Sequence, residues 1–595
     1  MHYFINSALN KQNSGIEHAQ LSRAQVFRAQ GWPFLLLYTN YNPQLSRWLP
    51  RFKVEPNEAL TLFDYYQRSQ VVPAKRLEPD DIWLSDDHDE REVRLLPGER
   101  KLEVYPGSPI AGRISWYEAP EDEPERCQVS SVERFDFHGM LYRVDHYDWR
   151  GWLSASDFYT RQNEWYQRTW WAYDTGEAVI TEVLNRAQAQ TTTRVTRWQV
   201  KDHNGHWHAY HTFRDLVAGW FDELNHASWS PVEPNYWVGD RMEGYEDALE
   251  ALQDPAIRIS HIHNSHGADV HDEMHSLLNN YYEYDLFHRS GERAYDFYIA
   301  ATHKQTQDMQ DRFGWTDRVV TIPVGLNQLL PHVPMDQRQP HSVLVTARRA
   351  EEKRIEQIIR MVGMVKQRGV DDITLDVYGY RDSRNHDAAA KKIDQALAEY
   401  GLDETTVRLH DYDPDLETVR DRHQVYMVWS TMEGFNIALM EAQNHGEVAI
   451  VNDVNYGPNE LTVDGENGFV CGYNDIEAGA DRLYQLFTHP EQLQAMSERA
   501  YQLSARYFTH ALAQGWEELH TRAHNLYMTR VAGLIEAKGP RTGLPTVTSE
   551  EMDQARETQA AERQQRQADQ DEALAREIAA ENARWLNRTK GGEAQ

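Results

Sequence analysis

The sequence predicts an α/β protein in which two Rossmann-like domains face each other across a cleft and an antiparallel β-meander is inserted in the first domain. Three observations support this fold class. The chain opens with a strand–helix–strand pattern, changes to short alternating runs rich in aromatic residues, and then returns to parallel-strand and helix patterning. At 595 residues the chain is also too long for a single core.

The opening pattern is a βαβ unit. A short strand ends at Asn6, a polar loop with Gly15 follows, and a helix over residues 16–29 is ended by Gly31. The apolar run 34–38 then has the length and composition of a buried strand. This order predicts the start of a parallel sheet.

The inserted meander follows. From about residue 68 to residue 201, short runs of Tyr, Trp, Phe, Arg and Thr alternate with glycines, which is typical of antiparallel strands joined by turns. The segment 78–125 is acidic and contains Pro-Gly and Glu-Asp-Glu-Pro, so we expect part of it to be loop.

Helix and parallel-strand patterning then returns, and it completes both domains. It covers residues 207–224, 236–238, 256–261 and 298–302 of the first domain, and strands 342–346, 375–378, 425–430 and 448–452 of the second. The predicted domains are residues 1–66 with 205–320, the inserted meander 67–204, the nucleotide-binding domain 321–510, a closing helix 511–540, and a polar helical or disordered tail 541–595.

The composition excludes several classes of protein. A formal net charge of −32 argues against nucleic-acid binding, which needs a basic surface to displace phosphate counterions. Cys127 and Cys471 lie far apart and lack C-x-x-C spacing, so neither a disulfide framework nor a zinc knuckle is indicated. No secretory signal is visible, and no window approaches the ~18 apolar residues of a membrane span. We therefore expect a cytoplasmic protein.

The best functional clue is a pair of glutamates, Glu433 and Glu441, separated by seven residues. If a helix starts near Asn436, Glu441 lies one to two turns in. Glu433 then precedes the positive end of the helix, where free N–H groups can hold phosphate. At ~1.5 Å rise per residue the carboxylates are about 10 Å apart along the axis, the span of a nucleotide-sugar. Alone, such a spacing also arises by chance in an acidic chain.

The order of features around this pair resembles the retaining GT-B glycosyltransferases of family 4. A β-rich run, residues 424–430, precedes the turn, and two further motifs follow at residues 456–460 and 464–468. The resemblance extends from Gly15 to about Gln514. Two groups share the pattern: the GtfA subunits of accessory-Sec adhesin glycosyltransferases, which glycosylate serine-rich proteins, and the poly(glycerol-phosphate) or teichoic acid glycosyltransferases.

The resemblance assigns donor-binding roles. Glu441 would hold the ribose hydroxyls and Glu433 the transferred sugar. The N–H groups of Gly434, Phe435 and Asn436 would hold the phosphates, with Asn436 in the place of the family's usual second glycine.

Two further elements match the family. Arg348 and Lys353, five residues apart where a strand gives way to a helix, match its cationic element and would neutralise the departing diphosphate. Without the glutamates they would read as surface charges. Gly15 lies in the loop that faces the donor phosphates, although a lone glycine at a helix start is more often only a turn.

Histidines end a predicted strand of the first domain. Alternation places His261 and His263 on one face, but no further ligands at fixed spacing join them, so neither a metal nor another cofactor is predicted. In the family a histidine at this strand end contacts the sugar. His263 is the best match and His266 the second.

The resemblance implies a hexosyltransferase that moves N-acetylglucosamine or glucose from a UDP-sugar to a bacterial cell-surface acceptor. A Ser/Thr acceptor on a serine-rich surface protein is favoured, and α-glucosylation of poly(glycerol-phosphate) wall teichoic acid is the alternative. A non-catalytic glycan-binding or chaperone subunit of a glycosyltransferase complex is the rival from another class. A homologous partner or a second copy is expected to dock through the meander, and peripheral membrane association is left open.

Overall fold

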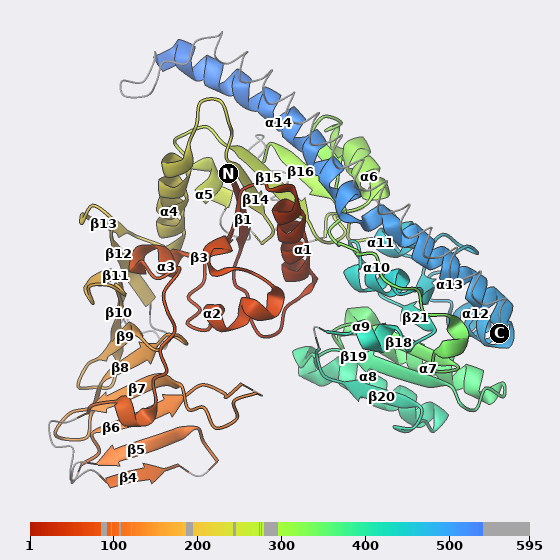
Figure 1. The fold of residues 1–595 in the computed structure, drawn as a ribbon, viewed down its shortest axis with the longest axis horizontal. Helices are drawn as coiled ribbons and strands as arrows, with labels where there is room; N and C mark the ends of the chain where they lie inside the picture. The colour runs from red at the N-terminus through yellow and green to blue at the C-terminus, as the bar shows by residue number, and fades with distance from the viewer. Residues whose placement is uncertain are drawn as a thin grey trace, which may run out of the picture.

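The described part of the chain forms three β-sheets, two parallel and one antiparallel (Figure 1). The predicted α/β architecture with an inserted meander is therefore confirmed. The computed structural model describes residues 1–84, 92–96, 98–105, 109–120, 122–185, 194–241, 246–269, 271–272, 274, 276–278, 282, 295–413 and 415–538. The predicted tail 541–595 and part of the segment 78–125 lie outside these ranges.

The first domain is built on a seven-stranded parallel sheet with the order β17-β16-β15-β14-β1-β2-β3. The first strand of the chain, His2–Asn6, has a parallel neighbour on each side, so that Phe4 lies between Leu36 and Val238. Burial on both faces is typical of a parallel sheet. The strands are β1 (His2–Asn6), β2 (Phe34–Tyr38), β3 (Ala59–Thr61), β14 (Tyr236–Gly239), β15 (Ile257–Ile262), β16 (Phe297–Ala300) and β17 (Val319–Thr321).

Helices cover both faces of this sheet. Phe4 packs with α1 (Gly15–Gln30) and α14 (Thr509–Lys538) on one face, whereas Tyr3 and Ile5 pack with α3 (Leu62–Gln67) and α4 (Phe213–Ser228) on the other. As predicted, Gly31 ends α1, in the left-handed conformation (φ 65°). The shorter helices are α2 (Leu45–Trp48), α5 (Glu246–Glu250) and α6 (His303–Phe313).

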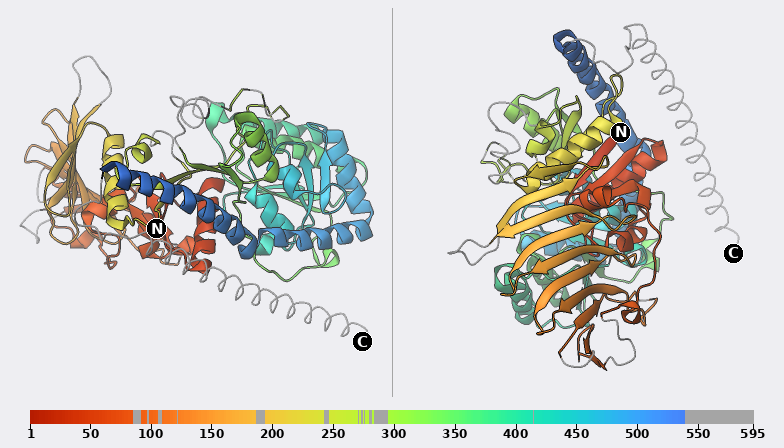
Figure 2. Two further views of the ribbon diagram at one scale, coloured as in Figure 1. Left: turned by 90° about the horizontal axis from the view of Figure 1, so that it is seen from above. Right: turned by 90° about the vertical axis from the view of Figure 1, so that its left-hand side faces the viewer.

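The meander is a ten-stranded antiparallel sheet whose strands pair in chain order from β4 to β13. It lies at the end of the molecule opposite the second domain (Figures 1 and 2). Its strands are β4 (Glu92–Leu95), β5 (Lys101–Tyr105), β6 (Gly112–Trp116), β7 (Val129–Phe135), β8 (Leu141–Tyr147), β9 (Leu153–Tyr159), β10 (Trp165–Trp171), β11 (Ala178–Asn185), β12 (Arg194–Lys201) and β13 (Trp207–Tyr210).

The end of the meander differs from the expected pattern. Residues 207–210 are a strand, because a tight turn at Gly205 (φ 87°) folds them back onto β12, where Trp207 pairs with Lys201. Helix α4 starts only after Thr212, whose side chain accepts from the backbone N–H of Asp215 in a capping box. The capping signal therefore marks the helix start more accurately than the hydrophobic pattern.

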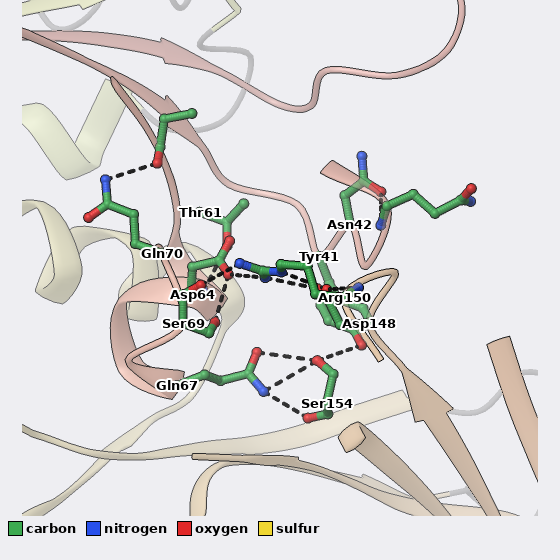
Figure 3. Close-up of polar contacts among 12 residues, drawn as sticks. Tyr41, Asn42, Thr61, Asp64, Gln67, Ser69, Gln70, Asp148, Arg150 and Ser154 are labelled. Atoms are coloured by element: carbon green, nitrogen blue, oxygen red, sulfur yellow. Dashed lines mark hydrogen bonds and ion pairs between the residues drawn. The ribbon is translucent and has the colours of Figure 1, made fainter. Parts of the chain in front are cut away.

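A buried polar network joins the meander to the first domain (Figure 3). Arg150, in the turn between β8 and β9, donates from Nε to Asp148 (2.7 Å) and from Nη2 to Asp64 of α3 (3.1 Å). Gln67, at the end of α3, donates to the carbonyl of Ser154 in β9 (2.8 Å). The Arg150 and Asp148 side chains are only 9% and 7% exposed, so this charged junction is almost desolvated.

The second domain is built on a six-stranded parallel sheet with the order β20-β19-β18-β21-β22-β23. The predicted strands 342–346 and 448–452 have the observed bounds. The strands are β18 (Ser342–Thr346), β19 (Thr374–Tyr378), β20 (Val407–His410), β21 (Val425–Val428), β22 (Val448–Asn452) and β23 (Gly468–Cys471). The helices are η7 (Glu351–Lys353, a single 3₁₀ turn), α7 (Ile355–Gln367), α8 (Arg384–Tyr400), α9 (Glu417–Arg420), α10 (Ile437–Asn444), α11 (Gly457–Leu461), α12 (Ile476–Thr488) and α13 (Pro490–Ser504).

The last helix, α14, returns to the first domain and runs along α1 (Figures 1 and 2). The rings of Trp516 and of Phe27 in α1 are in contact, with their centroids 5.0 Å apart. The Nε2 atoms of His520 and of His2 in β1 are 2.9 Å apart. None of the helices in the described part of the chain has the length and apolar character that crossing a bilayer requires.

Candidate active site

The carboxyl ends of both parallel sheets face one cleft of about 1390 Å³. In open α/β sheets, ligands bind beyond this end of the strands. The lining includes every residue that the sequence predicted for catalysis or donor binding, namely Gly15, His263, Arg348, Lys353, Glu433, Gly434, Phe435, Asn436 and Glu441. The fold thus brings these residues together from both domains, while their individual roles stay predictions.

The turn before α10 explains the departure at Asn436. This residue adopts a left-handed conformation (φ 75°), which glycine tolerates best and asparagine better than most other residues. Its side chain also caps α10 by accepting from the N–H of Leu439 (2.9 Å). Asparagine therefore replaces the family's glycine without strain and adds a cap.

The same turn touches the first domain. A Cβ at Gly434 would collide with the backbone carbonyl of His263, so only glycine allows this approach. Within the described part of the chain, the backbone N–H groups of Gly434, Phe435 and Asn436 have no hydrogen-bond acceptor. Three N–H groups at the positive end of α10 are therefore available for an anion.

Glu433 is held in place by three donors to one oxygen. Its Oε1 accepts from Ser430 Oγ (2.6 Å), from Lys353 Nζ (2.6 Å) and from Asn436 Nδ2 (3.2 Å). The carboxylate is 10% exposed, so its rotamer is fixed by these contacts and by packing. A preorganised acceptor of this kind suits a sugar hydroxyl.

Arg348 does not point into the cleft as a free cation. It is bound to Glu352 of the same turn, and its Nε lies 3.6 Å from Asp382 Oδ2. Arg384 binds the same two carboxylates but does not line the cleft. A diphosphate that binds Arg348 must therefore compete with two carboxylates, which the sequence did not indicate.

Glu441 has a buried partner that sequence reasoning missed. Arg420, at the end of α9 and 5% exposed, donates from Nη2 to Glu441 Oε2 (2.6 Å) and from Nη1 to the carbonyl of Ala438 (3.2 Å). Arg420 thus fixes the carboxylate that would hold the ribose. No motif surrounds Arg420, so nothing in the sequence could have identified it.

Gly15 starts α1, and Ser14 and Glu17 cap the helix reciprocally. Arg241 completes this corner by donating to Glu17 Oε1 (3.0 Å) and Ser14 Oγ (2.9 Å). Burial alone would raise the pKa of Glu17, but Ser14 and Arg241 outweigh it and lower that pKa below its ordinary value. A Cβ at Gly15 would meet nothing within 4 Å, so the fold itself does not require a glycine there.

The two candidate histidines occupy different places. His263 lines the cleft, and its Nε2 lies 2.8 Å from Asp240 Oδ1. His266 is fully buried behind the cleft, where its ring stacks on Tyr456 of the second domain. Burial, together with the charge of Arg312, lowers the pKa of His266 to about 4. The geometry favours His263 for contact with a substrate.

Asp240 supplies the third ligand that the histidine pair lacked in the sequence. One potential ligand atom each from Asp240, His261 and His263 lies within 4.8 Å of the others, the arrangement of a metal site. The three residues meet because β14 and β15 are parallel neighbours. However, Arg23 of α1 is bound to both Asp240 and His261, so a guanidinium already occupies this cluster.

Comparison with known proteins identifies relatives over almost the whole chain. Residues 336–503 match the family model "Glycosyl transferases group 1". Over 542 residues, 87% of this chain and 97% of the relative, the sequence is 24% identical to the UDP-N-acetylglucosamine--peptide N-acetylglucosaminyltransferase GtfA subunit of Streptococcus gordonii. Over 320 residues, 49% of this chain and 46% of the relative, it is 22% identical to the poly(glycerol-phosphate) alpha-glucosyltransferase of Bacillus subtilis.

Solved structures share the fold, and three of them illustrate the similarity. The pneumococcal O-GlcNAc transferase GtfA in complex with UDP and GlcNAc superposes with a TM-score of 0.73 at 22% identity, covering 88% of this chain and 98% of that one. A GtfA/B complex gives 0.66 at 22% identity (88% and 99% covered), and TarM gives 0.68 at 14% identity (87% and 98% covered).

The class of the protein follows from these findings. Its fold is the predicted GT-B fold, with two Rossmann-like domains and an inserted meander. Residues 336–503, in the second domain, match the group 1 glycosyltransferase model, and this match agrees with the predicted UDP-sugar hexosyltransferase class. The chain is similar to GtfA subunits along nearly their full length.

Proposed function

We propose that this protein is a retaining, family 4-like hexosyltransferase that moves N-acetylglucosamine from a UDP-sugar to Ser or Thr of a serine-rich bacterial surface protein. The observation that supports it best is that both glutamates, both cations and His263 line one cleft between the domains. The GtfA relative is a UDP-N-acetylglucosamine--peptide N-acetylglucosaminyltransferase subunit, which indicates the donor sugar and the peptide acceptor.

The geometry suggests how the donor is held. The free N–H groups before α10 donate hydrogen bonds to the diphosphate oxygens, and Lys353 and Arg348 supply the positive charge that stabilises the diphosphate as it departs. Glu433 accepts a sugar hydroxyl, and Glu441, fixed by Arg420, accepts the ribose hydroxyls. This charge neutralisation by side chains requires no obligatory metal.

Retention of configuration follows if the acceptor attacks from the face that the diphosphate leaves. The departing phosphate then takes the acceptor proton, and His263 contacts the sugar beside the broken bond. When the donor phosphate binds Lys353, this lysine leaves Glu433. Donor binding thereby frees the Glu433 carboxylate for the sugar hydroxyl.

Glucosylation of a poly(glycerol-phosphate) polymer is the second candidate, because the Bacillus subtilis relative carries that activity in its name. The charge of the chain counts against it. A protein with a net charge of −32 repels a polyanionic acceptor, whereas a neutral Ser/Thr-rich peptide meets no such barrier.

We also propose that the protein acts in the cytoplasm with a homologous subunit that docks on the meander. The solved GtfA/B complex supports a partner of this kind. A protein without its own activity would instead be the non-catalytic subunit of such a pair.

The test is release of UDP and transfer of sugar by the purified chain, alone and with its partner. UDP-N-acetylglucosamine and UDP-glucose are each offered with a Ser/Thr-rich peptide and with a glycerol-phosphate polymer. We expect transfer of N-acetylglucosamine to the peptide only. Transfer of glucose to the polymer would support the second candidate, and no transfer in any combination would refute catalysis by this chain.

Arg348→Ala checks the site assignment. It should lower transfer by about 100-fold or more, as loss of one preorganised donor does in other active sites. Arg384→Ala is the matched control, because it removes ion pairs with the same Glu352 and Asp382 from outside the cleft. Equal activity in both variants would show that Arg348 does not take part in transfer. Full activity in Glu433→Ala would likewise show that the Glu433 carboxylate does not bind the transferred sugar.

A further inference from the structure

A nearly dry cluster of charged and polar side chains lies directly behind His263. It contains Arg23 from α1, Asp240 after β14, and His261 in β15. The side chains of Arg23, Asp240 and His261 are 3%, 0% and 2% exposed. These three residues are not predicted to contact substrate, whereas His263, in front of them, is.

The hydrogen bonds of this cluster determine where its protons lie. A guanidinium can only donate, so His261 Nδ1, 2.7 Å from Arg23 Nη1, accepts and the His261 ring is neutral with its proton on Nε2. Burial, His263 and Arg23 all hold the pKa of His261 well below its ordinary value, which agrees with a neutral ring.

The same reasoning applies to His263. Burial alone would raise the pKa of Asp240, but the charge of Arg23 and the hydrogen bond from His263 hold it well below its ordinary value, so Asp240 is a carboxylate. A carboxylate can only accept, so His263 Nε2, 2.8 Å from Asp240 Oδ1, carries a proton. In the neutral ring, Nδ1 is then the acceptor.

Resting on the proposed function, we propose that Asp240 and Arg23 are positioning residues that fix the orientation and tautomer of His263, with the Arg23 guanidinium in place of a metal ion. The His263 ring is thereby presented to the substrate as a hydrogen-bond acceptor at Nδ1. A sugar or acceptor hydroxyl is the chemical group that such an acceptor recognises.

The surroundings of Arg23 explain why it and not a metal holds the cluster together. Its guanidinium lies over the Phe4 ring at 4.2 Å and near the Trp516 ring of α14 at 5.9 Å, so aromatic faces hold the cation from behind. A divalent ion among Asp240, His261 and His263 would lie beside this fixed positive charge. Repulsion at such a separation is strong in a buried site.

The kinetic test is Asp240→Asn. An amide can present either a donor or an acceptor to His263 and no longer selects one tautomer. We expect kcat to fall about 10- to 100-fold, by analogy with loss of the hydrogen-bond partner of a metal-bound histidine, with KM for the UDP-sugar changed less than about twofold. Asp254→Asn is the matched control, since Asp254 is also buried and bonded to a histidine, His226 (2.7 Å), but lies outside the cleft.

Asp240→Asn leaves Arg23 buried without its charge partner and can fail to fold for that reason. The double variant Arg23→Met/Asp240→Asn removes both charges together and keeps the kinetic test open. Wild-type kcat in either folded variant would overturn the proposal.

Two readouts do not depend on transfer activity, so they separate this inference from the proposed function. The first readout is the ¹⁵N-histidine NMR spectrum of the full chain, in which the His263 signals are assigned by their loss in His263→Gln. In the wild type these signals should show a protonated Nε2 and an unprotonated Nδ1. In Asp240→Asn they should show a mixture of both tautomers. The opposite tautomer in the wild type would refute the assignment.

Metal binding is the second readout. Co²⁺ should not bind this cluster in the wild type, and folded Arg23→Ala should gain a Co²⁺ site that is lost again on His261→Gln. Stoichiometric Co²⁺ binding by the wild type that His261→Gln abolishes would mean that the cluster is a metal site and that Arg23 does not replace the ion.

Discussion

Replacing Glu447 with glutamine should stabilise the protein above neutral pH. Glu447 lies between α10 and β22 and is fully buried, and among the described residues neither of its oxygens has a hydrogen-bond partner. Its counter-charge is Arg420, whose Nη1 lies 3.9 Å from Glu447 Oε2. Burial raises the pKa of Glu447 to about 7, although Arg420, His423 and Arg338 oppose this shift and Asp421 adds to it.

The magnitude follows from linkage between protonation and folding. Between the ordinary pKa of 4.5 and the folded value of about 7, the folded state binds more protons than the unfolded chain, so the free energy of unfolding falls as pH rises. The penalty is absent below about pH 4.5 and complete above about pH 7. At ~1.36 kcal/mol for each pH unit of difference, it amounts to about 3 kcal/mol.

Urea unfolding followed by circular dichroism at pH 5 and pH 8 measures this effect. Glu447→Gln should be about 3 kcal/mol more stable than the wild type at pH 8 and much closer to it at pH 5. Glu466→Gln is the control, because Glu466 is a 48% exposed partner of Arg499 and should change stability little at either pH. A variant no more stable than the wild type at pH 8 would refute the reasoning.

Three further predictions concern the cleft and the junction. Gly15→Ala should leave the melting temperature unchanged or slightly higher, because the added methyl group has no protein atom within 4 Å. If donor phosphates approach this residue, the same variant should bind the UDP-sugar more weakly in calorimetry, and unaltered affinity would contradict that contact. Arg150→Met should lower the free energy of unfolding by about 3–5 kcal/mol in denaturant titrations, because it leaves the carboxylates of Asp148 and Asp64 without their cation. Adding Asp148→Asn should recover part of this loss. An unchanged free energy of unfolding in the single variant would show that the junction contributes little to stability. Asn436→Ala should lower the free energy of unfolding by about 2 kcal/mol, because alanine is strained in the left-handed conformation and cannot cap α10. Asn436→Gly loses only the cap and should cost clearly less. Equal melting temperatures of the two variants would argue against backbone strain in the alanine variant.

The features that were predictable from the sequence are those with local signals. The βαβ opening is set by an apolar run, a capping box and Gly31, and these are adjacent in the chain. The turn at residues 433–436 could be placed because a carboxylate, a glycine and a helix start follow one another there. Local chemistry also decides where α4 starts, since Thr212 caps it.

The features that were missed depend on which distant segments become neighbours. Asp240 reaches His261 and His263 only because β14 and β15 pair as parallel strands, and no spacing in the sequence reveals that pairing. Arg420 reaches Glu441 from a separate short helix. The carboxylates that hold Arg348 include Asp382, which lies beyond the next strand. Motifs can identify such side chains, but only the packing shows their partners.

The return of α14 to the first domain has a consequence for biosynthesis. Its side chains complete the core that α1 and the first sheet began, with Trp516, Leu519, Ala523, Tyr527, Met528 and Val531 as contributing buried residues. During translation the strands of the first sheet emerge from the ribosome long before this helix does. The second domain therefore has all of its strands while the first still exposes an apolar face. The domain that is started first is finished last, and a nascent chain cut before α14 would present that apolar face to chaperones and proteases.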